Sequence, residues 1–501
     1  MDVVTPVRQQ GDLPDDIAPA APDPQPYVAP TRADPLARAA LPLLGGPLGR
    51  RSALGLSWWT PVRVALVAGM VTYAVGWLSK GYCVTHGWGA PQRYMYLCYS
   101  DIPVLYGARG IADGAFPYLL QPGAGQEVLE YPVLTGVFMY LAGWVTRLLG
   151  GTEVVFLGVT VAVMAALLAW TIASTAATVR RRPWDGLLVA LAPVVALAGF
   201  VNWDLLAVAL TAAGLAAWSA RRPGLAGMWI GLAAAAKFYP LVLVGPVLIL
   251  CARRGRWRAF GTFVAGALGA WLVVNLPVML ANLDGWLRFY TFSRERGMDF
   301  GSPWYALSLA GLTVPAGVLN TVSMGTFAAA CLAILALGAL APRPPRLAAL
   351  ALLTVGAFVL TNKVYSPQYV LWVLPLAVLA RPRWRDLLIW QLAEATYFVA
   401  IWWYLVGYGT QDKGLAYGWY IVAVACHWVA TAWFMGLVVR DALRPEHDPV
   451  RSDGFDEDVD DPGGGVLDSG AGALRGQDEG SVVEPLMTAE LSRRPRPAGP
   501  S

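Results

Sequence analysis

The sequence predicts an all-α polytopic membrane protein, and two observations support this prediction. Of its 501 residues, 56% are hydrophobic and only 14% are charged, whereas soluble domains carry about 25% charged residues. Several apolar runs also reach the roughly 20 residues that a membrane-spanning helix needs. The net charge of +4 does not indicate a nucleic-acid-binding protein, because the arginines lie at the ends of the apolar runs.

Both ends of the chain differ in composition from the apolar centre. Residues 1–57 are rich in Pro, Ala and Asp and lack apolar periodicity, so they are expected to form a disordered cytoplasmic tail. No cleavable signal peptide is visible, because this polar segment precedes the first apolar run. Residues 441–501 are acidic and Gly-rich and are also expected to be a disordered cytoplasmic tail. The transmembrane domain is therefore predicted to span residues 58–440.

Basic residues set the predicted topology. Arg50, Arg51 and Arg63 lie next to the first apolar helix, about residues 61–78, so the positive-inside rule places the N-terminus in the cytoplasm. The loop of residues 80–131 would then be a large first extracytoplasmic loop. The other basic clusters expected on the cytoplasmic side are Arg180–Arg182, Arg221–Arg222, Arg253–Arg258, Arg343 with Arg346, Arg381–Arg385 and Arg440.

Apolar helices are expected to connect these clusters in pairs, each pair leaving the cytoplasm and returning. This arrangement predicts about twelve crossings of the plasma membrane with both termini cytoplasmic. The predicted pairs are 186–201 with 204–219, 225–237 with 239–252, 259–280 with 320–341, 346–361 with 368–380, and 386–405 with 417–438.

Two apolar runs do not fit this alternation. The helix 152–179 must end in the cytoplasm at Arg180, so a full crossing by residues 133–149 would place that arginine outside. We therefore expect 133–149 to enter the membrane without a full crossing, unless the alternation is restored elsewhere in the chain. Residues 303–319 are expected to form a short helix at the outer surface. A total of eleven or thirteen helices is compatible with the same pattern.

The cysteines and histidines do not indicate a metal site. Two of the five cysteines, Cys83 and Cys98, flank the start of the first loop and could form a disulfide if that loop is extracytoplasmic. The three histidines, His86, His427 and His447, are scattered, and no metal-ligand spacing is present. We expect no metal and no cofactor.

With this topology the unusual polar residues gather at the outer face. Lys237 and Asp204 stand at ends of apolar helices, where ionisable groups are costly and usually functional, although a lysine can also extend to the interface. The polar segments on this face are 101–131, Asn202–Asp204, Lys237–Pro240, Arg294–Asp299, Asn362–Gln368 and Asp412–Lys413.

The chemistry of these groups favours group transfer. The sequence contains no P-loop, no Rossmann glycine pattern and no zinc motif. Carboxylates can act as a general base on a hydroxyl, and Lys and Arg can hold a phosphate. Aromatic side chains suit sugar faces and an isoprenoid chain. Together they fit sugar transfer from a lipid phosphate, and they also fit a transporter.

Five short segments resemble a known family. The chain resembles glycosyltransferase family 87 (the DUF2029 type) of the C superfamily, over about residues 60–440. These are integral membrane enzymes that use polyprenyl-phosphate sugars, and they include actinobacterial mannosyltransferases acting on phosphatidylinositol mannosides. The resemblance implies a C-type helical bundle. The matching segments are Tyr99–Pro103 with Tyr118, Glu130–Gly136, Asn202–Asp204, Lys237–Pro240 and Asn362–Gln368.

The resemblance also implies roles for individual residues. It implies Asp101 as the catalytic base. A usual form of the motif has two neighbouring acids and this chain has one there, so Glu130 is a possible second acid, either catalytic or orienting the acceptor. Lys237 and Lys363 are expected to contact the donor phosphate. The other expected substrate-binding residues are Arg294, Arg296, Tyr131, Asn202, Asp204, Tyr239, Tyr365 and Gln368.

The leading hypothesis is a polyprenyl-phosphate-dependent hexosyltransferase of the cell envelope, most simply a mannosyltransferase. Its partners would be the donor, a lipid or glycan acceptor, and membrane lipids, with the active site extracytoplasmic. A transporter or flippase of a lipid-linked saccharide is the alternative, and it predicts inverted repeats with acids near the midplane. A scaffold protein, which would bind without turnover, is a third possibility.

Overall fold

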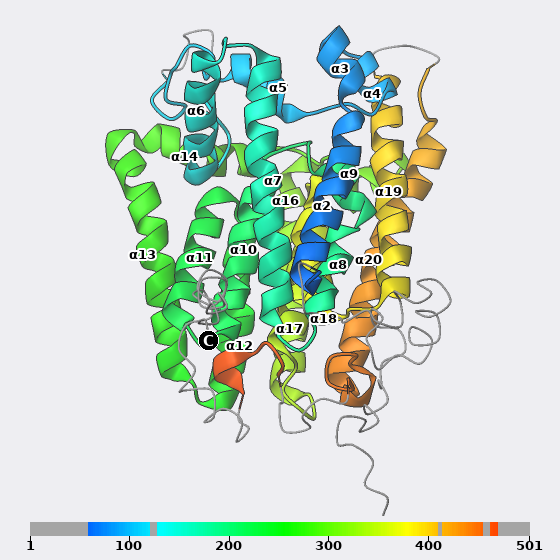
Figure 1. The fold of residues 1–501 in the computed structure, drawn as a ribbon. Coiled ribbons are helices and arrows are strands. Elements are labelled where there is room, and N and C mark those ends of the chain that lie inside the picture. The colour runs from blue at the N-terminus through cyan, green and yellow to red at the C-terminus, as the bar shows by residue number, and fades with distance from the viewer. Residues whose placement is uncertain (1–58, 121–127, 409–412, 454–460, 469–501) are drawn as a thin grey trace, which may run out of the picture.

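The computed structural model describes residues 59–120, 128–408, 413–453 and 461–468, which form a bundle of α-helices with a few short 3-10 helices (Figure 1). The predicted tail 1–57 lies outside the described residues. Five of the described helices are long and apolar enough to cross a membrane, which identifies a multi-pass membrane protein. They are α2 (Pro61–Leu78), α7 (Glu153–Thr178), α13 (Trp257–Ala281), α16 (Ala316–Leu340) and α20 (Tyr417–Leu443).

Shorter apolar helices complete the bundle, and they leave the predicted count of about twelve crossings open. A further helix, α19 (Trp384–Val406), carries the buried acids Asp386 and Glu394. The shorter helices are α6 (Val133–Leu148), α10 (Asp204–Ser219), α11 (Pro223–Ala236), α12 (Val244–Arg254), α17 (Leu347–Thr361) and α18 (Val370–Ala380).

Two of the predicted helices are broken where the sequence contains proline. The segment predicted at 186–201 is divided into α8 (Gly186–Ala190) and α9 (Pro193–Ala198), and Pro193 starts the second helix. The 3-10 helix η3 (Tyr239–Leu243) precedes α12. Other 3-10 turns are η2 (Pro183–Asp185), η4 (Pro367–Tyr369), η5 (Pro445–His447) and η6 (Gly465–Leu467).

The helix α6 is confined to one end of the bundle. In Figure 1 it occupies only the upper part, whereas α7, beside which it packs, runs the whole height. This is the arrangement expected for a segment that enters the membrane without crossing it. Two more helices lie at the same end. These are α14 (Leu283–Glu295), which the sequence pattern did not predict, and α15 (Pro303–Leu309), in the run predicted as a short surface helix.

The first loop is folded. It contains three short helices, α3 (Gly81–His86), α4 (Gln92–Met95) and α5 (Asp101–Ala108). A disulfide joins Cys83 to Cys98, with the Cα atoms 5.9 Å apart, which is the pairing that the sequence allowed. The bond ties the segment before α5 to α3 and so limits where Asp101 can lie.

Glycines allow α11 and α13 to pack closely. A Cβ atom on Gly227 would lie 1.9 Å from the carbonyl oxygen of Phe263, and one on Gly231 would lie 2.1 Å from that of Ala267. Gly266 of α13 meets Gly224 O in the same way, at 2.2 Å. Small residues let membrane helices approach to this distance. The packing fixes α11, whose C-terminal end carries Lys237.

At the opposite end, the C-terminal segment packs against the arginine clusters. Residues 441–453 and 461–468 are described and largely buried, whereas composition predicted disorder from 441 onwards. Asp448 accepts two bonds from the Arg346 guanidinium, at 2.6 and 3.0 Å. Asp453 lies 2.8 Å from Arg181. The difference arises because the partners of these acids lie about a hundred residues or more earlier in the chain, beyond the reach of local composition.

Arg346 connects three parts of this end. Its side chain is 1% exposed and also donates to the carbonyl oxygens of Leu379 and Ala380 at the end of α18. Asp461 accepts a bond from the backbone N–H of Leu347, at the start of α17. A single buried guanidinium therefore joins α17, α18 and the C-terminal segment.

We expect Arg346→Met to lower the stability of the folded protein by about 3–5 kcal/mol, because it leaves the buried carboxylate of Asp448 unpaired. Thermal unfolding in detergent measures the effect. The matched control is Arg343→Met, at an exposed position three residues earlier. Equal melting temperatures for the two variants would contradict the role of Arg346.

Candidate functional site

A cavity of about 920 Å³ lies where the first loop, α14 and the α17–α18 turn meet. It brings together most of the polar residues that the sequence placed on one face. Asp204 lies just behind its wall, and Arg294 and Tyr365 are not among its lining residues. The predicted site residues that line it are Asp101, Glu130, Tyr131, Asn202, Lys237, Tyr239, Arg296, Lys363 and Gln368.

Backbone contacts with the turn before α10 hold Asp101 in place. Ser100 caps α5, since its hydroxyl accepts the N–H of Ile102, and the same hydroxyl donates to the carbonyl oxygen of Phe200 at 2.7 Å. The N–H of Asp101 donates to Val201 O at 2.8 Å. Two segments a hundred residues apart in sequence are thus joined at the start of α5.

The Asp101 carboxylate is held by neutral donors. Tyr99 donates its hydroxyl to Oδ1 at 2.5 Å, and the Asn202 amide donates to Oδ2 at 2.8 Å. Asn202 also donates to the Tyr131 hydroxyl at 2.6 Å. Burial raises the pKa of Asp101 above its ordinary value, and the bonds from Tyr99 and Asn202 and the charge of Lys237 counteract part of this rise. A raised pKa makes the carboxylate a better proton acceptor.

Lys237 lies at the C-terminal end of α11 with a buried acid beside it. Its Nζ is 3.5 Å from Oδ1 of Asp204 and 4.7 Å from the centre of the Tyr131 ring. The same oxygen of Asp204 accepts the indole N–H of Trp372 at 2.6 Å. Asp204, which is fully buried, therefore compensates the lysine charge from behind.

Arg296 is a second cation on the cavity wall. Its guanidinium lies 3.0 Å from Asp299, and both residues line the cavity. The N–H of Asp299 donates to Lys363 O at 2.8 Å, so the loop after α14 is joined to the turn after α17. Arg294, by contrast, does not line the cavity.

The ammonium group of Lys363 is engaged with the backbone. It donates to the carbonyl oxygen of Arg294 at 2.9 Å and to that of Arg296. The side chain is 6% exposed. These bonds indicate that Lys363 holds the loop that carries Arg296. Lys363 also lines the cavity, and its expected contact with the donor phosphate stays a prediction.

Glu130 is paired on both oxygens. Arg109 Nε lies 2.8 Å from Oε2, and Nη2 lies 2.7 Å from Oε1. A bidentate pair of this kind holds a carboxylate in a fixed orientation. Of the two roles that the sequence left open, the geometry favours orientation over proton transfer.

Three other predicted residues have mainly packing contacts. Tyr239 lines the cavity and stacks on Trp372 with ring centres 4.6 Å apart. Gln368 also lines it, and its buried Oε1 has no hydrogen-bond partner among the described residues. Tyr365 points away and donates its hydroxyl to Glu394 at 2.7 Å.

Several lining residues were not predicted as site residues. Asp299 was noted on the outer face but without a role. Tyr94, Tyr99 and Trp402 are aromatic, and aromatic residues at membrane interfaces are common enough to hide a site. Tyr369 was also missed, although it directly follows Gln368 in a matched segment.

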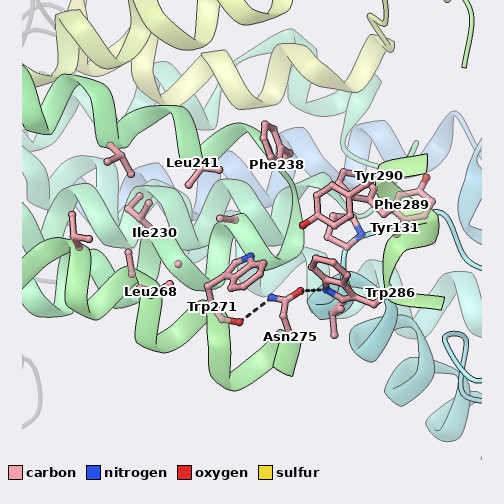
Figure 2. Close-up of a pocket in the computed structure, with 17 residues that line it drawn as sticks. Tyr131, Ile230, Phe238, Leu241, Leu268, Trp271, Asn275, Trp286, Phe289 and Tyr290 are labelled. Carbon is pink, nitrogen blue, oxygen red and sulfur yellow. Dashed lines mark hydrogen bonds between the residues drawn. The ribbon is translucent and has the colours of Figure 1, made fainter. Parts of the chain in front are cut away.

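A second, apolar cavity of about 300 Å³ adjoins the first between α11, α13 and α14 (Figure 2). In Figure 2, Tyr131, Phe289 and Tyr290 lie at one end, and Ile230 and Leu268 lie at the other. Those three aromatic residues line both cavities. The apolar space therefore opens onto the polar site, and its walls suit a hydrocarbon chain.

Within the described parts of the chain, no group of three or more His, Cys, Asp or Glu side chains could hold a metal ion. The charged side chains that line the cavity are Asp101, Glu130, Lys237, Arg296, Asp299 and Lys363.

Comparison with known proteins shows what this chain is similar to, namely glycosyltransferases. Residues 129–362 match the model of glycosyltransferase family 87, which confirms the resemblance seen in the sequence. The match includes Lys237 and Arg296, whereas Asp101 lies before it. Among solved structures, ArnT from Cupriavidus metallidurans bound to undecaprenyl phosphate is similar at 15% identity, over 76% of each chain, with a TM-score of 0.40. No curated protein matches the sequence.

The contacts of Asp101 predict the pH dependence of any reaction in which its carboxylate accepts a proton. If the carboxylate accepts the proton, activity falls as pH drops through its pKa, and this fall should occur above the value of about 3.9 for an ordinary Asp. Tyr99→Phe removes a bond to the charged form, so the pKa should rise further and the acidic limb should move to higher pH. Profiles of kcat/KM against pH measure the shift, with Tyr96→Phe at an exposed position as control. An acidic limb that does not move would show that Tyr99 does not act on this carboxylate.

Proposed function

We propose that this protein is a hexosyltransferase that moves a sugar, most simply mannose, from a polyprenyl-phosphate donor to a hydroxyl of a lipid or glycan acceptor. The observation that carries the proposal is the placement of Asp101. Its carboxylate, bonded by neutral groups, shares one cavity with the cations Lys237 and Arg296, and an apolar cavity opens beside it.

Asp101 acts as the general base. It takes the proton of the acceptor hydroxyl while the hydroxyl oxygen forms a bond to the anomeric carbon of the donor sugar. The bond between that carbon and the phosphate oxygen breaks, and its electron pair leaves with the polyprenyl phosphate. The base requires no covalent intermediate on the protein.

Lys237 and Arg296 stabilise the leaving phosphate. Each is paired with an acid, Lys237 with Asp204 and Arg296 with Asp299. The pairing keeps the empty cavity nearly neutral while the cations stay in position. Because they are already oriented, little reorganisation is needed as negative charge develops on the phosphate.

The apolar cavity between α11, α13 and α14 accommodates part of the isoprenoid chain. Its walls are aliphatic and aromatic, and its polar exception, Asn275, is bonded to Trp271 O and to the Trp286 indole, as Figure 2 shows. Burial of a hydrocarbon chain there contributes roughly 25 cal/mol per Å² of apolar surface. The isoprenoid chain would thus lie in the apolar cavity, and the phosphate would lie beside the cations of the adjoining polar cavity.

The site is extracytoplasmic in this proposal, at the plasma membrane. The arginine clusters at the other end of the bundle support this orientation through the positive-inside rule. The Cys83–Cys98 disulfide next to the site supports it as well, because disulfides persist in oxidising compartments.

Asp101→Asn should reduce transfer by about two to four orders of magnitude, the range typical for loss of a general base. The assay uses purified protein in lipid, a panel of radiolabelled polyprenyl-phosphate sugars and a membrane lipid extract. Asp113→Asn, at an exposed site in the same loop, is the matched control. Undiminished transfer by folded Asp101→Asn protein would refute the assigned role. Flipping of the lipid without transfer would favour the transporter.

Lys237→Met should weaken donor turnover by about tenfold to a hundredfold, since a hydrogen bond to a charged group is worth about 1.5–3 kcal/mol. Lys237→Arg should retain part of the activity because it keeps the charge. The measurement is kcat/KM for the donor, compared with Lys413→Met, which removes an exposed lysine. Equal kinetics for Lys237→Met and Lys413→Met would exclude Lys237 from the phosphate site.

A further inference from the structure

Asn202 lies between two residues of the proposed site and contacts both. It lines the large cavity, yet the residue is only 3% exposed. Its Nδ2 atom donates to Oδ2 of Asp101 at 2.8 Å and to the hydroxyl oxygen of Tyr131 at 2.6 Å. The proposed function uses Asp101 as the base and gives neither Asn202 nor Tyr131 a step in the reaction.

The orientation of the Asn202 amide group follows from its third contact. Its Oδ1 atom accepts the backbone N–H of Trp203 at 2.6 Å. A backbone N–H can only donate, so the atom that faces it must be the amide oxygen. The Nδ2 atom therefore faces Asp101 and Tyr131, and its two hydrogens supply one bond to each. With both hydrogens used, Asn202 has no donor left for a ligand in the cavity.

This orientation of the amide also limits the direction of the Tyr131 hydroxyl. Because the hydroxyl oxygen accepts a hydrogen from Asn202, its own proton must point elsewhere. Among the described residues, that proton is donated to no acceptor. Burial and the nearby charge of Asp101 raise the pKa of Tyr131 well above its ordinary value, so the phenol keeps the proton and remains a donor.

Tyr131 lies where the phosphate of a lipid donor would be bound. It lines both the polar and the apolar cavity, and Figure 2 shows it at one end of the apolar cavity with Phe289 and Tyr290. The phosphate of a polyprenyl donor is attached to the isoprenoid chain. If the chain occupies the apolar cavity, the phosphate must lie at the junction of the two cavities. Lys237 is beside this junction, since its Nζ lies 4.7 Å from the centre of the Tyr131 ring.

The chemistry of the junction favours a phosphate as the acceptor of the Tyr131 proton. A hydrocarbon chain offers no acceptor, and a hydrogen bond to a charged oxygen is stronger than one to a neutral oxygen. Tyr290 also lines both cavities and carries a hydroxyl, but its described contact is the packing of its ring on Trp286, with centres 4.9 Å apart. Of these two tyrosines, Tyr131 is the one whose hydroxyl is oriented by a neighbouring side chain within the described residues.

We propose that Asn202 positions both ends of the reaction: it orients the Asp101 carboxylate toward the acceptor hydroxyl, and it directs the proton of the Tyr131 hydroxyl to an oxygen of the donor phosphate. The inference rests on the proposed function and adds Tyr131 to the groups that stabilise the leaving phosphate. As the bond between the anomeric carbon and the phosphate oxygen breaks, Tyr131 donates a hydrogen bond to the phosphate and keeps its proton. The polyprenyl phosphate leaves as an anion.

Binding of farnesyl phosphate and farnesol, which share a chain and differ in the phosphate, measures the Tyr131 contact without turnover. Wild-type protein in detergent should bind farnesyl phosphate more tightly than farnesol. Tyr131→Phe keeps the ring and removes the hydroxyl, so it should weaken binding of farnesyl phosphate about tenfold and leave binding of farnesol unchanged. The matched control is Tyr140→Phe, on α6, which lines neither cavity. Equal affinities of these two variants for farnesyl phosphate overturn the inference, and sugar transfer by the wild type then leaves the proposed function standing.

The acidic limb of the pH profile of kcat/KM separates the two tasks of Asn202. Tyr99→Phe should move this limb and leave the binding of farnesyl phosphate unchanged, whereas Tyr131→Phe should do the reverse. Asn202→Ala should change both, because it removes a bond to the carboxylate of the base and leaves the Tyr131 proton without a fixed direction. The other charged groups that act on this carboxylate, Lys237 and Asp204, remain in all three variants. An Asn202→Ala variant that moves neither quantity overturns the inference.

The double variant Asn202→Ala/Tyr131→Phe distinguishes positioning from a general loss of structure. If Asn202 acts on the phosphate through Tyr131, the double variant should bind farnesyl phosphate as weakly as Tyr131→Phe alone. Additive losses of affinity overturn this coupling. The Tyr131→Phe variant keeps the test valid if Asn202→Ala does not fold. Wild-type protein that binds farnesyl phosphate no better than farnesol overturns the inference, and if it also transfers no sugar from any polyprenyl-phosphate donor, the proposed function is overturned with it.

Discussion

Charge compensation in a confined space governs the arrangement of this site. Ionised groups that leave water must be paired or hydrogen-bonded, and the cavity follows that rule residue by residue. Arg109 holds Glu130, Asp204 faces Lys237, and Asp299 faces Arg296. Asp101 differs, because both of its hydrogen bonds come from the neutral side chains of Tyr99 and Asn202. Neutral donors orient the carboxylate without suppressing its basicity as strongly as an ion pair would.

Hydrogen bonds between buried polar groups also hold the loop that carries Arg296. Lys363 uses its ammonium group to hold the carbonyl oxygens of Arg294 and Arg296, and the backbone of Asp299 bonds to Lys363 in return. The loop after α14 and the turn after α17 are therefore joined by hydrogen bonds from both sides. The close packing of α11 on α13 fixes Lys237 independently of that loop, so Lys237 and Arg296 are supported by separate elements.

The sequence predicted those features that show as a local change from apolar to polar residues. Lys237 and Asp204 stood out because polar side chains at the ends of apolar runs are unusual, and the helix boundaries followed from the same contrast. Asp101 and Asn202 were proposed as site residues through the resemblance to glycosyltransferase family 87. Tyr94 and Trp402 were missed because aromatic residues at membrane interfaces are ordinary. The bonds from Lys363 to the carbonyl oxygens of Arg294 and Arg296 could not be predicted, because a pattern of residue types does not show which acceptors surround an ammonium group. The order of residues 441–453 and 461–468 was missed since their partners, Arg346 and Arg181, lie far back in the chain.

The contacts of Asp448 and Asp453 with Arg346 and Arg181 bear on how the protein is made. A chain is synthesised and folds from its N-terminus, so these acids emerge after the helices that carry the arginines. In the orientation proposed above, the arginines would be exposed during insertion and would act as positive-inside signals. The acids of the C-terminal segment would pair with them later. The same guanidinium groups would thus orient the inserting helices first and then, after synthesis is complete, hold the C-terminal segment against the finished bundle.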